Sequence, residues 1–184
     1  VIYINPRKVK LIASLDIKPK SGCAYFLKKD WDKTVESIEE RFERDAKYRT
    51  AREILVQKIP IEETSEMQSV ERRIKKSGNY RGYESASQFM QSVADLYNSL
   101  QKEGYQRSLI DRIYPWLGGV EAVIGADLEL IKINGGNHRF AASYVLGVGT
   151  IPLQICALDE CYFNSAHPIK TIRQVLNRIQ DKYA

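Results

Sequence analysis

The stretch that decides the fold of this 184-residue chain is a glycine pair followed by a basic and then alanine-rich segment, Gly135-Gly136-Asn137-His138-Arg139-Phe140-Ala141-Ala142. The apolar run before it, from Leu128 to Ile133, predicts a buried strand. Leu146-Gly147 after it predicts the end of a short helix, and the alternating run from Ile151 to Ala157 predicts a half-buried strand. Together these runs predict the order strand, tight turn, helix, strand.

The turn has the properties of a phosphate site. Glycine lets the backbone turn tightly and approach a ligand closely. Where a helix begins, backbone N–H groups lack intrahelical partners and the helix dipole is positive. Arg139 can add a bidentate contact to phosphate oxygens, and His138 a hydrogen bond. Without further context, an ordinary turn with a surface arginine is the favoured interpretation, because a lone Gly-Gly pair is a weak signal.

The octet resembles the sulfiredoxin signature Gly-Gly-Cys-His-Arg-Tyr-Ala-Ala and the Gly-x-x-Arg-x-x-Ala-Ala box of the ParB partition proteins, over about residues 120 to 158. This resemblance implies the ParB/sulfiredoxin-like fold, in which the turn and the helix start hold the phosphates of ATP or CTP. The implied nucleotide-phosphate-binding residues are Gly135, Gly136, Asn137, His138 and Arg139. The catalytic cysteine of sulfiredoxin corresponds to Asn137. The side-chain amide of Asn137 cannot act as the thiolate nucleophile that the sulfiredoxin reaction needs. This difference argues against cysteine sulfinic acid reduction as the activity.

Composition sets broad limits on the class of protein. A net charge of +5 and a pI near 9.0 suit an anionic ligand without choosing one. Cys23, Cys156 and Cys161 show no Cys-x-x-Cys spacing and only two histidines are present, which argues against a disulfide framework or a structural zinc site. We expect Cys156 to be a small core residue. No apolar run reaches membrane-spanning length and no signal-peptide pattern is seen, so we expect no membrane span and a cytoplasmic location.

We expect an α+β fold and a single domain over residues 1–184, with a small mixed sheet and a helical insertion at about 33–117. From Thr34 onward a helical face carries Val35, Ile38 and Phe42, with Asp32 or Thr34 as its cap. The clearest helix is predicted over 85–102, with Ser85 and Gln88 as a capping box. A further helix is predicted over 107–117, which contains Trp116, and another begins with Pro168 as its first residue.

The segment 59–82 is highly charged and has few large apolar residues. Its basic run 72–76 and the tyrosines Tyr80 and Tyr83 admit a loop that contacts phosphates or nucleic acid by stacking. A solvated, mobile loop is favoured, because an extended interleaving of base-stacking aromatic residues is missing.

Two carboxylates are candidates for the acidic role in catalysis, as a Mg²⁺ ligand or a general base. Asp32, in Asp30-Trp31-Asp32, is preferred because it lies at a predicted loop-to-helix junction, and Glu129 within the strand is the reserve. Helix capping by Asp32 and packing of Trp31 form the slightly favoured structural alternative. Lys132 is expected either to reach a phosphate or to lie on the surface.

The resemblance implies a protein that binds ATP or CTP with Mg²⁺. We expect a phosphotransferase (kinase) or NTP hydrolase acting on a small molecule or glycan. The sequence does not decide whether the protein is an enzyme or a binding module. One alternative is a nucleotide-controlled module that binds DNA or protein, as in ParB. ParB proteins carry a helix-turn-helix domain after this fold, however, and only about one helix follows the Ile-Pro strand here. Another is a ParB-like nuclease, which needs an acidic metal cluster. A nucleic-acid partner is therefore possible but not favoured.

Overall fold

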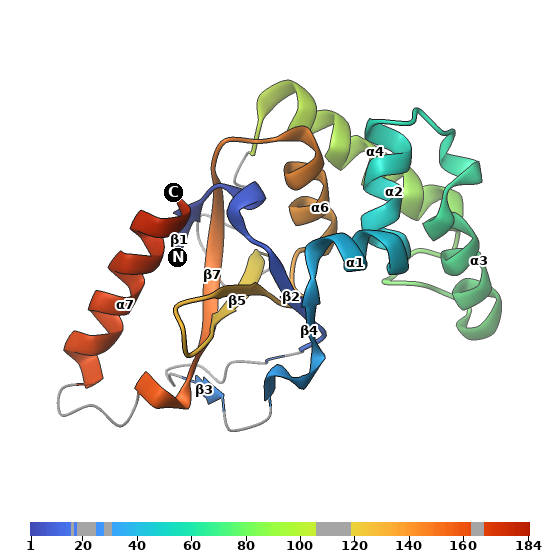
Figure 1. Cartoon of the computed structure of the whole chain (residues 1–184). Coiled ribbons are helices and arrows are strands. Elements are labelled where there is room, and N and C mark those ends of the chain that lie inside the picture. The colour runs from blue at the N-terminus through green and yellow to red at the C-terminus, as the bar shows by residue number, and fades with distance from the viewer. Residues whose placement is uncertain (16, 18–24, 28–30, 106–118, 163–167) are drawn as a thin grey trace. The chain divides into compact units, whose positions relative to one another are not determined.

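The computed structural model describes residues 1–15, 17, 25–27, 31–105, 119–162 and 168–184 (Figure 1). The helix predicted over 107–117, with Trp116, lies outside the described residues, as do Asp30 and Cys23. The chain divides into two compact units. The first comprises Val1–Glu39, Arg107–Gly136 and Gly149–Ala184, and the second Glu40–Gln106 and Asn137–Val148. The expectation of one domain with an insertion at about 33–117 stays a prediction.

The first unit contains an open mixed sheet. Its described strands are β1 (Ile2–Ile4), β2 (Leu11–Ala13), β3 (Tyr25–Leu27), β4 (Val35–Ser37), β5 (Val120–Ile124), β6 (Leu130–Lys132) and β7 (Ile151–Asp159). The strand order is β1-β7-β5-β6-β2-β4, and β3 also pairs with β7. β7 runs parallel to β5 and β3 and antiparallel to β1, while β6 is parallel to β2 and antiparallel to β5. The predicted mixed α and β character is therefore confirmed.

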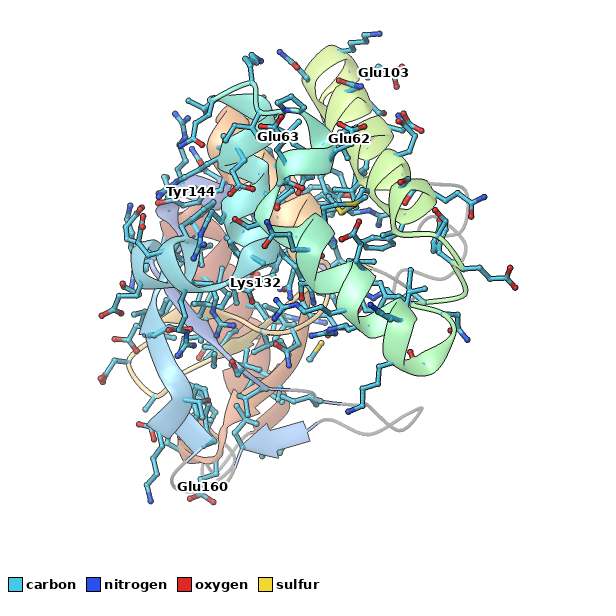
Figure 2. The ribbon with its side chains drawn as sticks, turned by 90° about the vertical axis from the view of Figure 1, so that its right-hand side faces the viewer. Glu62, Glu63, Glu103, Lys132, Tyr144 and Glu160 are labelled. Atoms are coloured by element: carbon cyan, nitrogen blue, oxygen red, sulfur yellow. The ribbon has the colours of Figure 1, made fainter. Side chains whose placement is uncertain are left out.

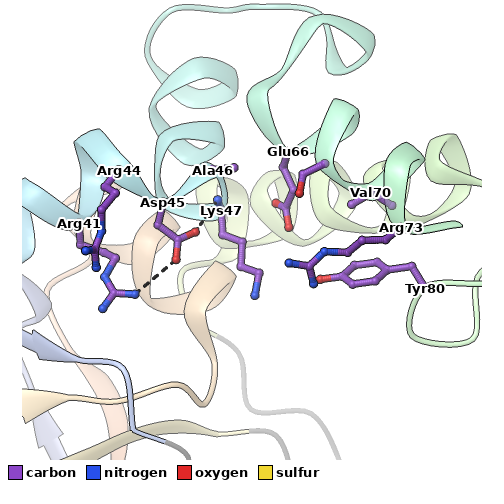
Figure 3. A pocket seen from close by; sticks show the side chains of 10 residues that line it. Arg41, Arg44, Asp45, Ala46, Lys47, Glu66, Val70, Arg73 and Tyr80 are labelled. Atoms are coloured by element: carbon purple, nitrogen blue, oxygen red, sulfur yellow. Dashed lines mark hydrogen bonds and ion pairs between the residues drawn. The ribbon is translucent and has the colours of Figure 1, made fainter. Parts of the chain in front are cut away.

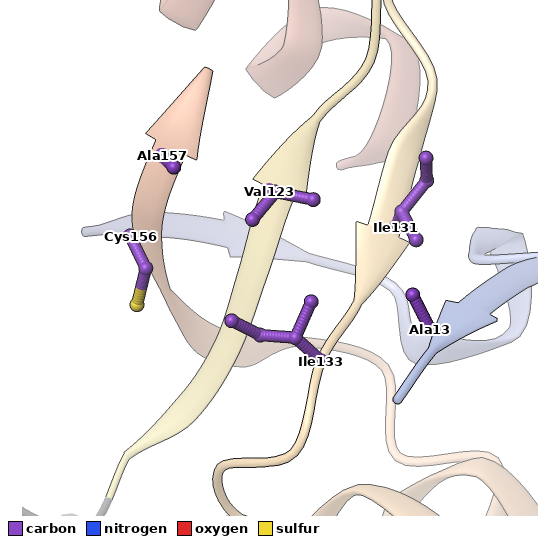
Figure 4. Packing of buried hydrophobic residues seen from close by; sticks show 6 residues of the cluster. All are labelled: Ala13, Val123, Ile131, Ile133, Cys156 and Ala157. Atoms are coloured by element: carbon purple, nitrogen blue, oxygen red, sulfur yellow. The ribbon is translucent and has the colours of Figure 1, made fainter. Parts of the chain in front are cut away.

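The centre of the sheet carries an apolar cluster of Ala13, Val123, Ile131, Ile133, Cys156 and Ala157 (Figure 4). The pairing of β5 with β7 slips by one residue, because Ala122 lies opposite Ile155 whereas Val123 lies opposite Ala157. This bulge ends the predicted alternation along β7, and Cys156 and Ala157 are both buried. Cys156 is thus a core residue, as predicted.

The first unit also contains the short helices η1 (Pro6–Lys8), η2 (Trp31–Thr34) and η4 (Glu160–Tyr162) and the long helix α7 (Pro168–Tyr183). Helix α7 begins at Pro168, as predicted. It buries Val175, Ile179 and Tyr183, which are spaced four residues apart on one face. The Tyr183 hydroxyl accepts a hydrogen bond from the Leu130 N–H at 3.1 Å, so the last turn of α7 is tied to β6.

The second unit is helical. Its elements are α1 (Ile38–Arg44, of which Ile38 and Glu39 belong to the first unit), α2 (Ala46–Leu55), η3 (Ile61–Glu63), α3 (Ser65–Ser77), α4 (Ala86–Glu103) and α6 (Asn137–Leu146). Helix α6 packs against α2 and α4. It buries Phe140, Ala141 and Ala142 completely, so the alanine pair of the octet permits close helix packing.

The structure corrects two sequence predictions for residues 34–82. The expected solvated loop over 59–82 is wrong, because α3 occupies most of it and buries Glu66, Met67 and Val70. The expected helix from Thr34 is also wrong, since Val35 begins β4, which pairs with β2, and α1 begins only at Ile38.

Helix α4 matches the predicted helix within one residue at each end. Ser85 occupies its N-cap position, but the Ser85 side chain makes no capping hydrogen bond there, so the predicted capping box is wrong.

The segment around the octet has the predicted order of β6, turn, α6 and β7. Helix α6 ends at Leu146, and Gly147 follows with a φ of +69°, a left-handed conformation that favours glycine. None of the helices in the described ranges is both long enough and apolar enough to cross a membrane.

Candidate functional site: a basic cavity in the helical unit

Both glycines of the octet belong to the first unit, and the backbone packing there requires glycine at Gly136. Gly136 has a φ of +68°, and a Cβ added to it would lie 2.7 Å from the Gly119 carbonyl oxygen and 2.8 Å from the Val120 Cα. A Cβ added to Gly135 would overlap the Glu121 side chain. Close backbone packing therefore explains Gly136 without a ligand, whereas Gly135 faces only a side chain, and phosphate binding by these two residues stays a prediction.

Lys132 is fully buried in the first unit, so its interpretation as a surface lysine is wrong (Figure 2). Its Nζ donates hydrogen bonds to the carbonyl oxygens of Ile133 and Gly135. The Gly135 carbonyl also accepts from the Glu121 N–H at 3.3 Å. The ammonium group thus stabilises the backbone just before the turn.

The two acidic candidates also lie in the first unit. Asp32 is exposed in η2, and the predicted helix cap at this position does not form. Trp31 packs against the central apolar cluster, as predicted, and its Nε1 donates to Asp159 Oδ2 at 2.9 Å. Glu129 is half-buried and lies just before β6, so its predicted place within the strand is wrong. The described ranges contain no group of three or more His, Cys, Asp and Glu that could hold a metal ion. The catalytic roles of Asp32 and Glu129 stay predictions.

The basic part of the octet begins α6 in the second unit. Asn137 Oδ1 accepts a hydrogen bond from the Tyr48 hydroxyl at 3.3 Å. His138 is buried, its Nε2 lies 2.8 Å from Glu66 Oε2, and its ring packs edge-on against Phe89. Arg139 is half-buried. The Asn137 and His138 side chains thus have partners within the helical unit, and the N–H groups of the first turn are natural donors to an anion.

Glu66 is one of the residues of this site that the sequence did not reveal. It lies in the first turn of α3 and is only 2% exposed. Its backbone N–H donates to Thr50 Oγ1 at 3.1 Å, and that hydroxyl in turn donates to Glu53 Oε2 at 3.2 Å. Glu53 also accepts from the Ser65 N–H at 2.8 Å. This network fixes the start of α3 against α2 and so positions the Glu66 side chain.

The two carboxylate oxygens of Glu66 have different surroundings. Oε2 contacts His138, whereas Oε1 is buried and has no hydrogen-bond partner among the described residues. Burial raises the pKa of the neighbouring Tyr97 well above its usual value, and Glu66 adds to the increase. In such surroundings an unpaired carboxylate oxygen is costly, and it calls for a donor from water or a ligand.

Glu66 lines a cavity of about 320 Å³ formed by α1, α2, α3 and Tyr80 (Figure 3). Four basic side chains line it, Arg41, Arg44, Lys47 and Arg73, against two acidic ones, Asp45 and Glu66. Figure 3 shows the Glu66 carboxylate and the ends of Lys47 and Arg73 directed toward the same space.

Asp45 is already engaged in other contacts. Its Oδ2 lies 3.5 Å from Arg41 Nη1, and its Oδ1 caps α2 by accepting from the Lys47 N–H at 3.0 Å. Positive charge and one unsatisfied acceptor therefore characterise the cavity.

Comparisons with models of protein families, with curated proteins and with solved structures found no match for this chain.

Proposed function

We propose that this chain is a ParB/sulfiredoxin-like protein that binds ATP or CTP with Mg²⁺. It either transfers the terminal phosphoryl group of the nucleotide to a small molecule or glycan, or hydrolyses the nucleotide. The observation that carries the proposal is the contact of His138 with Glu66, because it links the signature helix to a basic cavity within one compact unit. The resemblance of the octet and the order β6, turn, α6, β7 support the same proposal.

The proposed phosphate site is the N-terminus of α6. Its first-turn N–H groups and the positive end of its dipole suit phosphate oxygens, and the Arg139 guanidinium can add two parallel hydrogen bonds to them. Mg²⁺ usually keeps several waters and is bound by substrate phosphates with only one or two carboxylates. Asp32 is our preferred candidate for the acidic role in catalysis, as metal ligand or general base, and Glu129 is the reserve. Catalysis would then rest on positioning and charge neutralisation, as phosphoryl transfer requires.

A nucleotide panel, with and without Mg²⁺, tests this proposal by thermal shift and calorimetry. A nucleotide at a hundred times its Kd should add about 2.7 kcal/mol of stability. Arg139→Ala should weaken binding by about 1.5–3 kcal/mol, the range for hydrogen bonds to charged groups. Arg72→Ala is the matched control, because Arg72 is exposed on α3 and donates to its own helix at Gln68 O. Unchanged affinity in Arg139→Ala would show that the phosphates bind elsewhere.

Turnover separates the enzyme from the nucleotide-controlled binding module. Native protein that binds nucleotide but consumes none, with any sugar, amino-acid or nucleic-acid acceptor, would support the module. Asp32→Asn and Glu129→Gln then locate the acidic role, because loss of turnover with retained binding in one variant identifies that residue. Among the described residues nothing favours the nuclease alternative.

A further inference from the structure

We propose that the cavity lined by Glu66 binds a small ligand that carries both an anionic group and a hydroxyl group. We further propose that this ligand is the phosphate acceptor, a role that rests on the proposed function, whereas the binding itself does not. The cavity is separate from the N-terminus of α6, because neither Asn137 nor Arg139 lines it.

The basic side chains select the anionic group. Within the described parts of the chain neither Lys47 nor Arg73 is ion-paired to a carboxylate, although both line the cavity. Arg73 is exposed and Lys47 is half-buried, and a cleft lined by charges of one sign raises the local concentration of oppositely charged ligands. The guanidinium of Arg73 can bind a carboxylate or a phosphate through two parallel hydrogen bonds. The hydroxyl of Tyr80, whose ring lies 5.4 Å from the Arg73 guanidinium carbon, can donate to the same group.

Glu66 selects the hydroxyl group. A simple anion in the cavity would leave the buried Oε1 without a donor and would place negative charge beside it. A hydroxyl next to the anionic group donates to Oε1 while the anion faces the basic side chains. The volume of about 320 Å³ is at the lower end of the range for ligand sites, about 300–1,000 Å³, and so favours a small molecule over a whole nucleotide.

The same contact supplies a base for transfer. The acceptor oxygen forms a bond to the γ-phosphorus of the nucleotide. The bond from that phosphorus to the β–γ bridging oxygen breaks, and its electron pair stays on the nucleoside diphosphate. The hydroxyl proton passes to Oε1 of Glu66, the carboxylate oxygen that has no donor among the described residues.

Calorimetry without nucleotide tests the site with two matched pairs of probes. Glycerol 3-phosphate is compared with propyl phosphate, and glycerate with propionate, so that each pair shares its anionic group and differs in its hydroxyls. We expect the hydroxylated probe of at least one pair to bind about tenfold or more tighter, as expected of a hydrogen bond to a charged acceptor. The pair that shows the difference identifies the anionic group.

Two variants locate the binding. Glu66→Gln should reduce the preference for the hydroxylated probe to less than about threefold, since a neutral amide is a weaker acceptor that cannot take the proton. Arg73→Gln should weaken all anions about tenfold, whereas Arg72→Gln, outside the cavity on the same helix, should have no effect. The proposal is overturned if no probe binds, if each pair binds equally, or if Arg73→Gln binds like the native protein.

Nucleotide binding by the same variants distinguishes this inference from the proposed function. If glycerol 3-phosphate or glycerate binds as described but no nucleotide binds, the proposed function fails and the cavity site stands. If nucleotide binds and the cavity probes do not, the proposed function stands and the cavity site fails. Labelled nucleotide with the probe that binds should give labelled phosphate ester. Nucleotide hydrolysis without ester formation would refute the acceptor role.

Discussion

Gly136→Ala separates the two explanations of the octet's glycine pair, packing and phosphate contact. In the native chain Gly136 has a φ of +68°, and its Cα faces the backbone of Gly119 and Val120 in the same unit. Alanine in a left-handed conformation costs about 1–2 kcal/mol. Its methyl group would also lie 2.7 Å from the Gly119 carbonyl oxygen, and backbone cannot move aside as a flexible side chain can. Overpacking of this kind costs about 1–3 kcal/mol. We therefore expect the free energy of unfolding to fall by about 2–5 kcal/mol.

Gly149→Ala is the matched control, because Gly149 belongs to the same unit, has no positive φ, and an added Cβ there meets nothing within 4 Å. Its free energy of unfolding should change by less than about 0.5 kcal/mol. Urea denaturation followed by circular dichroism measures both variants. A Gly136→Ala protein as stable as Gly149→Ala would refute the packing explanation. If it then also lost nucleotide affinity, direct phosphate approach to Gly136 would be the remaining reason for the glycine.

Two further perturbations test the surroundings of the candidate residues. Glu53→Ala removes the acceptor of the Ser65 N–H and the Thr50 hydroxyl, and each buried donor left unpaired costs about 1–3 kcal/mol in the free energy of unfolding. Glu62→Ala, at an exposed glutamate of η3 (Figure 2), should change it by less than about 0.5 kcal/mol, and equal effects of the two would refute the network at the start of α3. Asp159→Asn tests the contact between Asp159 and Cys161. Partial burial raises the pKa of Asp159, but hydrogen bonds from the Cys161 N–H and from Trp31 outweigh this effect and leave the pKa below its usual value. Burial and the nearby Asp159 raise the pKa of Cys161 to about 11. Because the folded state lowers the pKa of Asp159, the ionised carboxylate stabilises the fold above the unfolded-state pKa, and this effect is lost as pH falls through the folded-state value. The free energy of unfolding of the variant, followed as the pH is lowered, should therefore fall less than that of the native protein. Removal of the Asp159 charge should also speed the alkylation of Cys161 at neutral pH, as measured by peptide mass spectrometry. Cys156, whose pKa burial raises to about 12, should stay unreactive in both proteins, and an unchanged Cys161 rate would contradict the assignment.

Local sequence signals predicted the elements whose causes are local. The apolar run before the glycines, the glycine that ends α6 and the alternation from Ile151 to Leu153 each reflect a constraint within a few residues, and the order around the octet was correct. Strand β4 could not be read in this way, because Val35–Ser37 is a strand only through its pairing with β2. Its residues follow a helical hydrophobic spacing equally well.

Helix α3 and the cavity were missed for a related reason. The buried face of α3 consists of Glu66, Met67 and Val70, and a buried glutamate reads as solvent-exposed in any hydrophobic pattern. Its partner His138 is 72 residues away in the sequence. The basic run 72–76 did show that positive charge gathers here. Only the folded chain shows that Arg73 lines the cavity and the neighbouring Arg72 does not.

The contact between Glu66 and His138 is poorly explained by stability alone. Taking a carboxylate and an imidazole out of water is costly, and well-packed apolar side chains of similar size often give an equally stable core. A purely structural pair would in addition satisfy both carboxylate oxygens, whereas Oε1 of Glu66 is left without a donor among the described residues. The arrangement becomes favourable once a ligand supplies that donor, since the imidazole then fixes the orientation of the carboxylate and the basic side chains hold the ligand's anionic group. The histidine of the octet would therefore act by positioning Glu66, and the direct contact with phosphate that the resemblance implies for it would fall to the backbone and to Arg139. His138→Gln distinguishes the two roles. Positioning predicts that the variant loses the preference for a hydroxylated probe and keeps its nucleotide affinity, whereas direct contact predicts the opposite.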